Sequence, residues 1–259
     1  ANIPVAIVRI VEVKGSSPRG VGSMMLVDQK GKLLEGTIGG GALEEKAKED
    51  AINCIRHKTS KMISYDLGCG SEADDALPMI CGGKVSVFIK VIRSRDILTI
   101  AGGGHVSQKL AKLAQILDYD VKVIDDRKEI LTRKYFPENV ELILGDISDK
   151  LKRVPIDENT NIVILTHGHK YDQDCLEVVV DSSARYIGMI GSTNKIKTCF
   201  DNLLNKGISK EQLNKVYTPI GVDIGGQTPE EIALSIMAEI QAVKYGKDIC
   251  HVRDKCKGR

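Results

Sequence analysis

The sequence lacks several features that would place it in a specialised class of protein. No segment reaches the unbroken apolar length of about 20 residues that crosses a membrane, and no N-terminal signal pattern is visible. The formal net charge is only +2, so the chain has no strong field of either sign, which argues against nucleic acid as a partner. Low-complexity segments and clear internal repeats are also missing. With 259 residues, these absences leave one large globular domain or two ordinary ones.

Cysteine is present, but not in the pattern of a disulfide framework. The seven cysteines are an odd number, scattered without close pairing in a chain long enough to bury a sizeable core. This usage favours reduced thiols and predicts a cytoplasmic protein. The chain begins inside the apolar run IPVAIVRIVEV, from which we expect that a natural N-terminal piece precedes Ala1.

The first 94 residues are typical of a mixed α+β domain. Short β-rich runs dominate this half, at 5–13, 23–27 and 84–92. One helical pattern interrupts them at 42–57, with apolar residues spaced by four along a narrow stripe: Leu43, Ala47, Ala51 and Ile55. The polar stretch RSRD at 93–96 is a short linker between two predicted domains, 1–94 and 95–259.

After this linker, apolar strand patterns alternate with helical ones. The strand patterns lie at 97–101, 121–125, 140–144, 161–166 and 185–191. This rhythm predicts an α/β domain with a Rossmann-like, doubly wound parallel sheet. The last helical pattern is the best marked, because Thr228, Pro229 and Glu231 occupy the N-cap, N1 and N3 positions of a capping box.

The stretch GGGHVSQKL follows the first of these strands and opens its helix. Gly102 and Gly104 occupy the first two glycine positions of G-x-G-x-x-G, where glycine permits a tight turn and a close approach of the backbone to a diphosphate. Ser107 stands at the third position, and Asp125 ends the second strand, where dinucleotide-binding domains carry an acid. The pattern predicts a phosphate-bearing ligand, and the alternative is a tight turn that binds nothing. The acid favours NAD over NADP, whereas Arg127 offsets this preference.

The stretch THGHKYDQD lies at the end of the fourth strand, on the edge of the sheet where ligands bind. His167, His169, Asp172 and Asp174 are residue types that suit zinc or iron. The alternative, which we favour, is that Asp172 caps a helix and the histidines line a cleft without metal.

Two more glycine-rich turns lie in the first half. The run GTIGGGALEE places Gly39, Gly40 and Gly41 before the helical pattern, either to present backbone donors to a ligand or to allow close packing of the helix on a sheet.

The second of these turns, MICGGKVSV, places Cys81 directly before Gly82 and Gly83, whose N–H groups are free to face a thiolate. Lys84 is a positive neighbour that lowers a thiol pKa. On local sequence alone, a buried cysteine beside a turn explains the stretch equally well.

Several motifs follow one another in an order that resembles one known family. They are GSSPRGVGSMMLV, GTIGGGALE, MICGGKV, GGGHVSQKLAKLA, VIDDR, THGHKYD, YIGMIGSTNK and PIGVDIGGQTPEEIALSIMAEI. Together these motifs resemble the XdhC/CoxI family, the accessory factors of xanthine and carbon monoxide dehydrogenases. The chain departs from the family at Ser107, where glycine is usual, and at Thr193 and Asn194, where arginines are usual.

The resemblance implies an N-terminal XdhC/CoxI domain followed by a Rossmann-like domain. It also implies a chaperone rather than a free-standing enzyme, which binds the molybdenum cofactor (molybdopterin), supports its sulfuration and delivers it to an apo molybdenum hydroxylase of the xanthine dehydrogenase type. A cysteine desulfurase and a second copy of the chain, as a homodimer, are the further partners that we expect.

Within this hypothesis both glycine runs address one elongated, phosphate-bearing pterin. Cys81 is the candidate chemical residue, as a thiolate that contacts molybdenum or carries the transferred sulfur. The candidate cofactor-binding residues are Gly39, Gly40, Gly41, Gly82, Gly83, Gly102, Gly103, Gly104, His105, Asp125, His167 and His169. Two other classes stay open: an NAD-dependent oxidoreductase, suggested by the α/β half, and a metal-dependent hydrolase built on THGHKYD.

Overall fold

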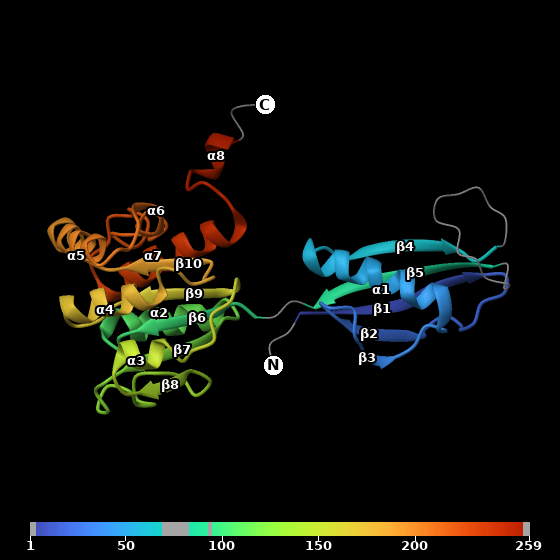
Figure 1. Ribbon diagram of the computed structural model, residues 1–259, viewed down its shortest axis with the longest axis horizontal. Coiled ribbons are helices and arrows are strands. Elements are labelled where there is room, and N and C mark those ends of the chain that lie inside the picture. Colours follow the sequence, from blue (N-terminus) through green and yellow to red (C-terminus); the bar gives the residue numbers. More distant parts are fainter. Residues whose placement is uncertain (1–3, 69–82, 93–94, 256–259) are drawn as a thin grey trace. The chain divides into compact units, whose positions relative to one another are not determined.

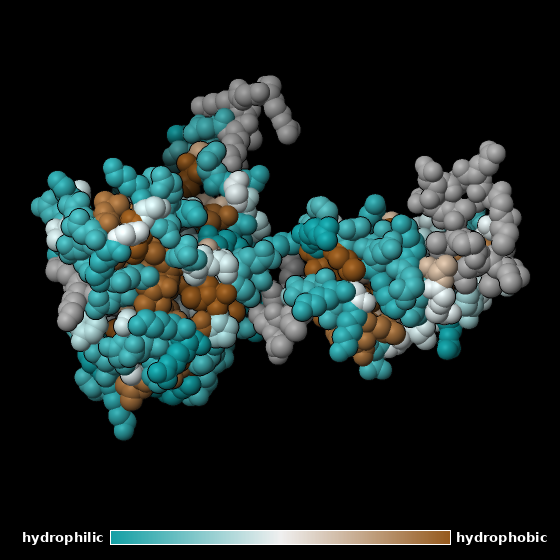
Figure 2. All heavy atoms as spheres, in the orientation of Figure 1, coloured by the Kyte–Doolittle hydropathy of each residue, from teal (hydrophilic) through white to brown (hydrophobic). Residues whose placement is uncertain are grey.

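The computed structural model describes residues 4–68, 83–92 and 95–255 (Figure 1). The chain forms two compact units, Ala1–Ser94 and Arg95–Arg259. Within the described ranges, no helix combines the length and the apolarity needed to cross a membrane. Hydrophilic residues cover most of the visible face of each unit, with hydrophobic residues showing between them (Figure 2).

In its described residues, the first unit is an antiparallel sheet with one helix packed on it. The strands stand in the order β3-β2-β1-β5-β4. The elements are β1 (Val5–Lys14), β2 (Met24–Asp28), β3 (Leu33–Gly36), α1 (Gly41–Arg56), β4 (Lys61–Asp66) and β5 (Lys84–Ile92). Alternate residues of the central strands, such as Val8 and Val87, point to α1 and are fully buried there with Leu43 and Ala47. The structure therefore contains the expected helix and the expected strands at 5–13, 23–27 and 84–92.

The sequence patterns missed the two outer strands of this sheet, β3 and β4. Both are edge strands, and most of their side chains are exposed or half-buried. Without a buried face, such a strand carries no regular apolar alternation. The pairing of β3 with β2 and of β4 with β5 forms these strands.

The second unit is a five-stranded parallel sheet in the order β10-β9-β6-β7-β8. Its strands are β6 (Ile97–Ala101), β7 (Asp120–Asp125), β8 (Glu141–Leu144), β9 (Thr160–Ile164) and β10 (Tyr186–Met189). Its helices are α2 (His105–Ile116), α3 (Ile147–Leu151), α4 (His169–Val179), α5 (Thr193–Asn205), α6 (Lys210–Leu213), α7 (Pro229–Tyr245) and α8 (Val252–Lys255). This is the strand order of the doubly wound Rossmann fold, as the sequence predicts.

Two separate cores cover the two faces of this sheet. One contains apolar residues of α2 and α7, including Leu110 and Ile236. The other contains apolar residues of α3, α4 and α5, including Leu176 and Leu203. The chain therefore crosses to one face after β6 and to the opposite face after β9, although these two strands are hydrogen-bonded neighbours. Such a reversal opens a crevice at the carboxyl ends of the two strands, where ligands bind in sheets of this kind.

Candidate functional site

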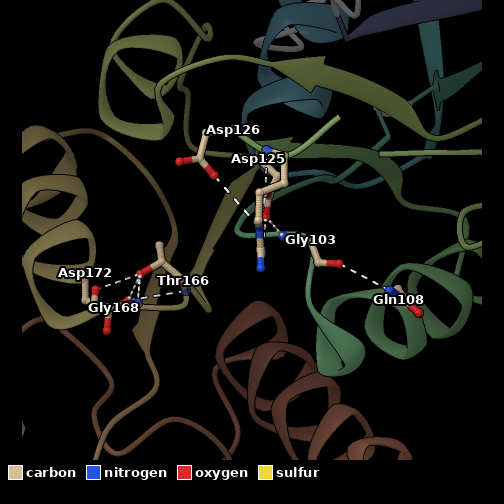
Figure 3. A network of polar contacts seen from close by, with 8 residues as sticks. Gly103, Gln108, Asp125, Asp126, Thr166, Gly168 and Asp172 are labelled. Carbon is tan, nitrogen blue, oxygen red and sulfur yellow. Dashed lines mark hydrogen bonds and ion pairs between the residues drawn. The ribbon is translucent and has the colours of Figure 1, made fainter. Parts of the chain in front are cut away.

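Two of the motifs found in the sequence lie at the carboxyl ends of β6 and β9, where the chain reverses from one face of the sheet to the other. The glycine run 102–104 follows β6, and the turn 166–168 follows β9. Figure 3 shows these two turns with the end of β7, which carries Asp125 and Asp126. The structure thus brings together three stretches that are far apart in the chain.

Gly102 is required by the backbone itself. Its φ is +104°, a region that residues with a side chain rarely adopt. A Cβ atom at this position would lie 2.3 Å from the carbonyl oxygen of Leu165 in the neighbouring turn. The Gly102 N–H donates to Ile124 O at 2.8 Å, and the Leu165 N–H donates to Ala101 O at 2.8 Å. Gly102 therefore allows the turns after β6 and β9 to lie against each other.

Gly104 plays a different part, because it is the N-cap residue of α2. Its φ is −65°, and among the described atoms none lies within 4 Å of the position of a Cβ atom there. Among the described residues, no side chain caps the N-terminus of α2. The N–H groups of the first turn, from His105 onward, lack intrahelical acceptors, and the helix dipole adds partial positive charge. Such a combination is chemically suited to an anion such as a phosphate.

Asp125 holds the glycine run in place from inside the fold. Its side chain is fully buried, and one oxygen accepts a hydrogen bond from the Gly103 N–H at 2.6 Å. The Arg127 guanidinium donates to both carboxylate oxygens, at 2.8 Å each, and the Arg127 N–H donates to Oδ1 at 2.9 Å. Burial by itself raises the pKa of the Asp125 carboxyl, but these hydrogen bonds outweigh it and hold the pKa below its usual range.

The partners of Asp125 change the expected preference between NAD and NADP. That expectation relied on an aspartate whose charge opposes a 2′-phosphate. In the structure each oxygen of Asp125 already accepts two hydrogen bonds, and its charge is paired with Arg127. The carboxylate therefore positions the loop, and it supplies no reason to favour one dinucleotide.

Ser107, at the third position of the glycine pattern, is fully buried in α2. Within the described ranges its hydroxyl has no hydrogen-bond partner. The helix thus packs with a hydroxymethyl group in place of glycine, without a compensating hydrogen bond.

The THGH turn has an internal carboxylate of its own, Asp172. The sequence suggested that Asp172 caps the helix, but α4 begins earlier and Gly168 is its N-cap. Asp172 lies in the first turn of α4 and reaches back: its Oδ1 accepts hydrogen bonds from Thr166 Oγ1 at 2.6 Å and from the Thr166 N–H at 3.3 Å (Figure 3). The N-terminus of α4, like that of α2, is therefore preceded by glycine and without a side-chain cap among the residues described.

The structure describes the side chain of His167 in this turn, but not that of His169. His167 is exposed, and its ring packs against Tyr171 with ring centroids 4.8 Å apart. His169 begins α4, and its side chain lies outside the described part of the structure. In the described part of the chain, no group of three or more histidine, cysteine, aspartate or glutamate side chains could hold a metal ion.

The glycine run of the first unit is also organised by a buried carboxylate. Gly39, Gly40 and Gly41 all have positive φ, at 127°, 72° and 60°, and lead into α1. Glu44 Oε2 accepts hydrogen bonds from Thr37 Oγ1 at 2.6 Å and from the N–H groups of Gly40 and Ile38 at 3.1 and 3.3 Å. Burial raises the pKa of Glu44, and these hydrogen bonds lower it to a net value below the usual range. The sequence patterns did not point to Glu44, whose only signal is its place one turn after Gly40.

Cys81 and Gly82, from the stretch MICGGK, lie outside the described residues. Gly83, which follows them, is buried, and a Cβ atom there would lie 2.1 Å from Ser16 O. Its carbonyl accepts a hydrogen bond from the Leu67 N–H at 2.7 Å. Gly83 therefore has a structural reason to be glycine, just before β5 begins at Lys84.

The buried thiols of the described residues are poor nucleophiles. Burial raises the pKa of Cys175 to about 12 and that of Cys199 to about 11, and it also raises the pKa of Cys54. Cys175 lies well inside α4. Cys250 is exposed near the C-terminal end of the chain.

Comparison with known proteins identifies the family. A family model described as XdhC Rossmann domain matches residues 98–240, and a model described as XdhC and CoxI family matches residues 1–66. An uncharacterized protein named YqeB from Escherichia coli is 31% identical over 94% of this chain and 44% of its own length. A relative from Bacillus subtilis, named as a probable component of xanthine dehydrogenase, is 30% identical over 60% of this chain and 45% of its own length. The chain thus spans less than half the length of these two relatives.

Two further matches cover most of both chains. The molybdenum cofactor insertion chaperone PaoD from Escherichia coli is 22% identical, over 93% of this chain and 84% of its own length. A crystal structure described as a xanthine dehydrogenase from Bacillus halodurans shares the fold, with a TM-score of 0.54 and 22% identity over 95% of this chain and 93% of that one. Two matching family models, on a Rossmann-type unit preceded by a smaller α+β unit, place this chain in the XdhC/CoxI family.

Proposed function

We propose that this chain binds the molybdenum cofactor, supports its sulfuration and delivers it to an apo molybdenum hydroxylase of the xanthine dehydrogenase type. Membership of the XdhC/CoxI family supports this function, as does the similarity to a protein named a molybdenum cofactor insertion chaperone. The relative from Bacillus subtilis, with xanthine dehydrogenase in its name, supports the identity of the target. In this proposal the cofactor is cargo, and the chain is its carrier.

The open N-terminus of α2 is the observation that carries the proposal. The cofactor has a phosphate, and the first turn of α2 offers N–H groups and partial positive charge at the crevice between β6 and β9. A negative charge at such a site gains about 0.3–1 kcal/mol when exposed and up to about 2 kcal/mol when partly buried. Gly104 leaves room for the phosphate, and Asp125 fixes Gly103 so that the turn keeps its shape when empty.

In the first unit, we propose that the glycine run 39–41 supports the binding of the ligand. Glu44 already takes the N–H groups of Ile38 and Gly40. The donors left for a ligand are those from Gly41 onward, at the start of α1. Cys81, which follows β4 and precedes β5 in the chain, is the proposed thiol that contacts molybdenum or carries sulfur supplied by a cysteine desulfurase.

The binding of the cofactor is tested by purifying the protein from cells that make molybdopterin. After denaturation and oxidation, the fluorescence of the released pterin measures the amount bound. We expect wild type to carry the pterin and a folded Gly104→Val variant to lose it, because a β-branched side chain would stand where the phosphate approaches. Gly20→Val is the matched control, since a Cβ atom there also meets nothing within 4 Å among the described residues. Wild type without pterin, or equal amounts in Gly104→Val, would refute the proposal.

The role of Cys81 is tested by activation of a molybdenum hydroxylase. Cys81→Ser nearly preserves shape and replaces a soft sulfur donor by a hard hydroxyl. We expect it to bind the pterin but to activate the hydroxylase at least tenfold less than wild type, whereas Cys69→Ser activates normally. If Cys81→Ser activates as well as wild type, Cys81 is only a turn residue.

The remaining partner proposals concern assembly. We propose a homodimer that binds a cysteine desulfurase and the apo-hydroxylase. Light scattering measures the mass of the purified chain, and co-purification with each tagged partner measures binding. A monomer that activates the hydroxylase without a desulfurase would contradict this part.

The second candidate function is an NAD-dependent oxidoreductase. It is favoured by the strand order of the second unit and by the glycine run with Asp125 at the end of β7. Titration with NAD distinguishes the two functions: saturable binding that displaces no pterin from the protein would favour the oxidoreductase. No contact within the described ranges favours the metal-dependent hydrolase.

A further inference from the structure

A cavity of about 460 Å³ opens between α4 and α5, beside the carboxyl end of β10. Its floor is apolar and buried, formed by Met189, Ile196 and Cys199. The sequence patterns singled out none of these residues as a site. The volume is within the range of about 300–1,000 Å³ that is common for small-molecule sites.

Amide side chains also line the cavity. Gln173 of α4, with Asn194 and Asn202 of α5, lines the cavity, and Asn202 Nδ2 donates a hydrogen bond to Gln173 Oε1 at 2.9 Å. This hydrogen bond joins the two helices across one wall. Lys195 and Asp172 also line the cavity, so that it contains one residue of each charge.

The cavity lies on the same edge of the sheet as the phosphate site at α2. β9 stands between β6 and β10, and neighbouring strands are about 4.8 Å apart, so the ends of β6 and β10 are separated by roughly 10 Å. The THGH turn after β9 stands between the two sites in the order of the sheet, and Asp172, bonded to Thr166 of that turn, also lines the cavity. One elongated molecule can therefore reach both.

We propose that this cavity holds the ring system of the pterin while the phosphate lies at the N-terminus of α2. The inference rests on the proposed function and adds the site of the ring. Sulfur atoms of methionine and cysteine make favourable contacts with aromatic rings, and Met189 and Cys199 both belong to the floor. Amide groups pair with the donor and acceptor edge of a heterocycle, as asparagine and glutamine do with adenine. A balanced pair of charges suits an uncharged ring better than a second phosphate.

The test uses 6-hydroxymethylpterin, a fluorescent pterin without a phosphate. Thr198 lines the cavity from α5, so Thr198→Trp places a large ring in its mouth. The neighbouring Lys197 is exposed and is not part of the cavity lining, so Lys197→Trp is the matched control. We expect Thr198→Trp to weaken binding at least tenfold, and Lys197→Trp to leave it within twofold of wild type. A Gln173→Leu/Asn202→Leu variant, which removes the amides at similar size, should also lose at least tenfold. Wild-type affinity in both cavity variants overturns the inference.

The amount of co-purified cofactor separates this inference from the proposed function. If wild type carries the cofactor and Thr198→Trp carries as much, the ring lies elsewhere and only the inference fails. If wild type carries no cofactor but binds 6-hydroxymethylpterin in a manner that Thr198→Trp abolishes, the proposed function fails and the ring site stands.

Discussion

At the scale of single residues, three buried carboxylates organise three of the turns that the sequence singled out, at 39–41, 102–104 and 166–168. Glu44, Asp125 and Asp172 each accept a hydrogen bond from a backbone N–H of a turn, and Glu44 and Asp172 also accept one from a threonine hydroxyl. Hydrogen bonds to an ionised carboxylate are stronger than those between neutral groups. The loops therefore have their shape without a ligand, which lowers the entropic cost of binding one.

Gly102 and Gly104 should differ in how strongly the same substitution lowers the stability of the fold. Gly102→Ala forces a side chain into a positive-φ position 2.3 Å from Leu165 O. We expect the free energy of unfolding to fall by about 1–3 kcal/mol, the usual cost of such strain. In Gly104→Ala the added methyl group enters open space at a φ of −65°. The free energy of unfolding should therefore change by less than about 1 kcal/mol. Urea denaturation measures both; equal losses in the two variants would refute the distinction.

Asp125 should make stability depend on pH. The folded-state pKa of its carboxyl lies below the value of about 3.9 in an unfolded chain. Its charge therefore stabilises the fold above that pH, and this contribution is lost as the pH falls through the folded-state pKa. We expect Asp125→Asn to lower the unfolding free energy at pH 7 by at least about 1.5 kcal/mol, the lower end for a hydrogen bond to a charged group.

The difference between wild type and Asp125→Asn should stay constant from pH 7 to 5 and shrink below pH 4. Asp126→Asn is the control, because the Asp126 side chain is 30% exposed and lies 3.9 Å from Arg127 Nε. Surface pairs of this kind contribute about 0–1 kcal/mol. A difference between wild type and Asp125→Asn that grows below pH 4 would show that the sign is wrong.

At the scale of elements, the helices of the second unit fall into two groups by their N-termini. Side chains cap α3, α6 and α7, through Asp146, Ser209 and Thr228. In the described residues, α2 and α4 have glycine as the N-cap residue and no side-chain cap. Within the described ranges α2, α4 and also α5, after Ser192, thus leave their first N–H groups without a side-chain cap, whereas caps stabilise α3, α6 and α7.

A side-chain cap added to α2 should increase the stability of the fold and prevent binding of the pterin. Gly104 has the extended backbone of an ordinary N-cap residue, with φ −65° and ψ −174°. Gly104→Asp places a carboxylate on the N–H groups of the first turn, and we expect a gain of roughly 0.5 kcal/mol from the hydrogen bond and the helix dipole. The same carboxylate should exclude the phosphate, so the co-purified pterin should disappear. Stability by urea denaturation and pterin fluorescence together check this; retained pterin in a stabilised variant would contradict it.

Removing an existing cap should lower the stability of the fold and leave pterin binding unchanged. In α7 the Glu231 N–H donates to Thr228 Oγ1 at 3.3 Å, and Glu231 Oε2 accepts from the Thr228 N–H at 2.9 Å. We expect Thr228→Ala to lower the unfolding free energy by about 1 kcal/mol, while Thr228→Ser retains most of it. The pterin content should equal that of wild type. Equal stability of the alanine and serine variants would show that the cap contributes nothing.

At the scale of the whole molecule, the chain consists of two units with separate cores. The core of the first unit contains residues between Ala6 and Ile89, and both cores of the second lie between Leu98 and Ile240. Asp96 belongs to the second unit, where it pairs with Lys244 of α7 at 2.7 Å and with Arg185. The boundary between the units therefore falls before this ion cluster.

A fragment of residues 95–259 should fold by itself, because it retains both of its cores and Asp96. We expect a cooperative thermal transition within a few degrees of one transition of the full chain. The fragment should also bind 6-hydroxymethylpterin as the full chain does, but it should not activate a hydroxylase, because it lacks Cys81. An unfolded fragment would show that the units depend on each other.

Much of the fold and part of the site followed from local patterns in the sequence. The parallel strands of the second unit and the capping box of α7 were predicted, because apolar periodicity and cap residues act over a few positions. The strand, glycine run and helix around 102–104 were also predicted, since they form a local signature; their role in binding a ligand stays a prediction. The family resemblance, which depends on motifs in order along the chain, was confirmed.

Only the tertiary structure decided what these residues contact. The edge strands β3 and β4 exist through pairing with their neighbours, not through a pattern of their own. The sequence placed Asp125 at the end of a strand, but its bonds to Gly103 and Arg127 depend on how β7 lies beside β6. The cavity between α4 and α5 likewise forms where two helices pack on one face of the sheet. The sequence by itself determined which backbone shapes are allowed, and packing between distant segments determined which donors and surfaces remain available to a ligand.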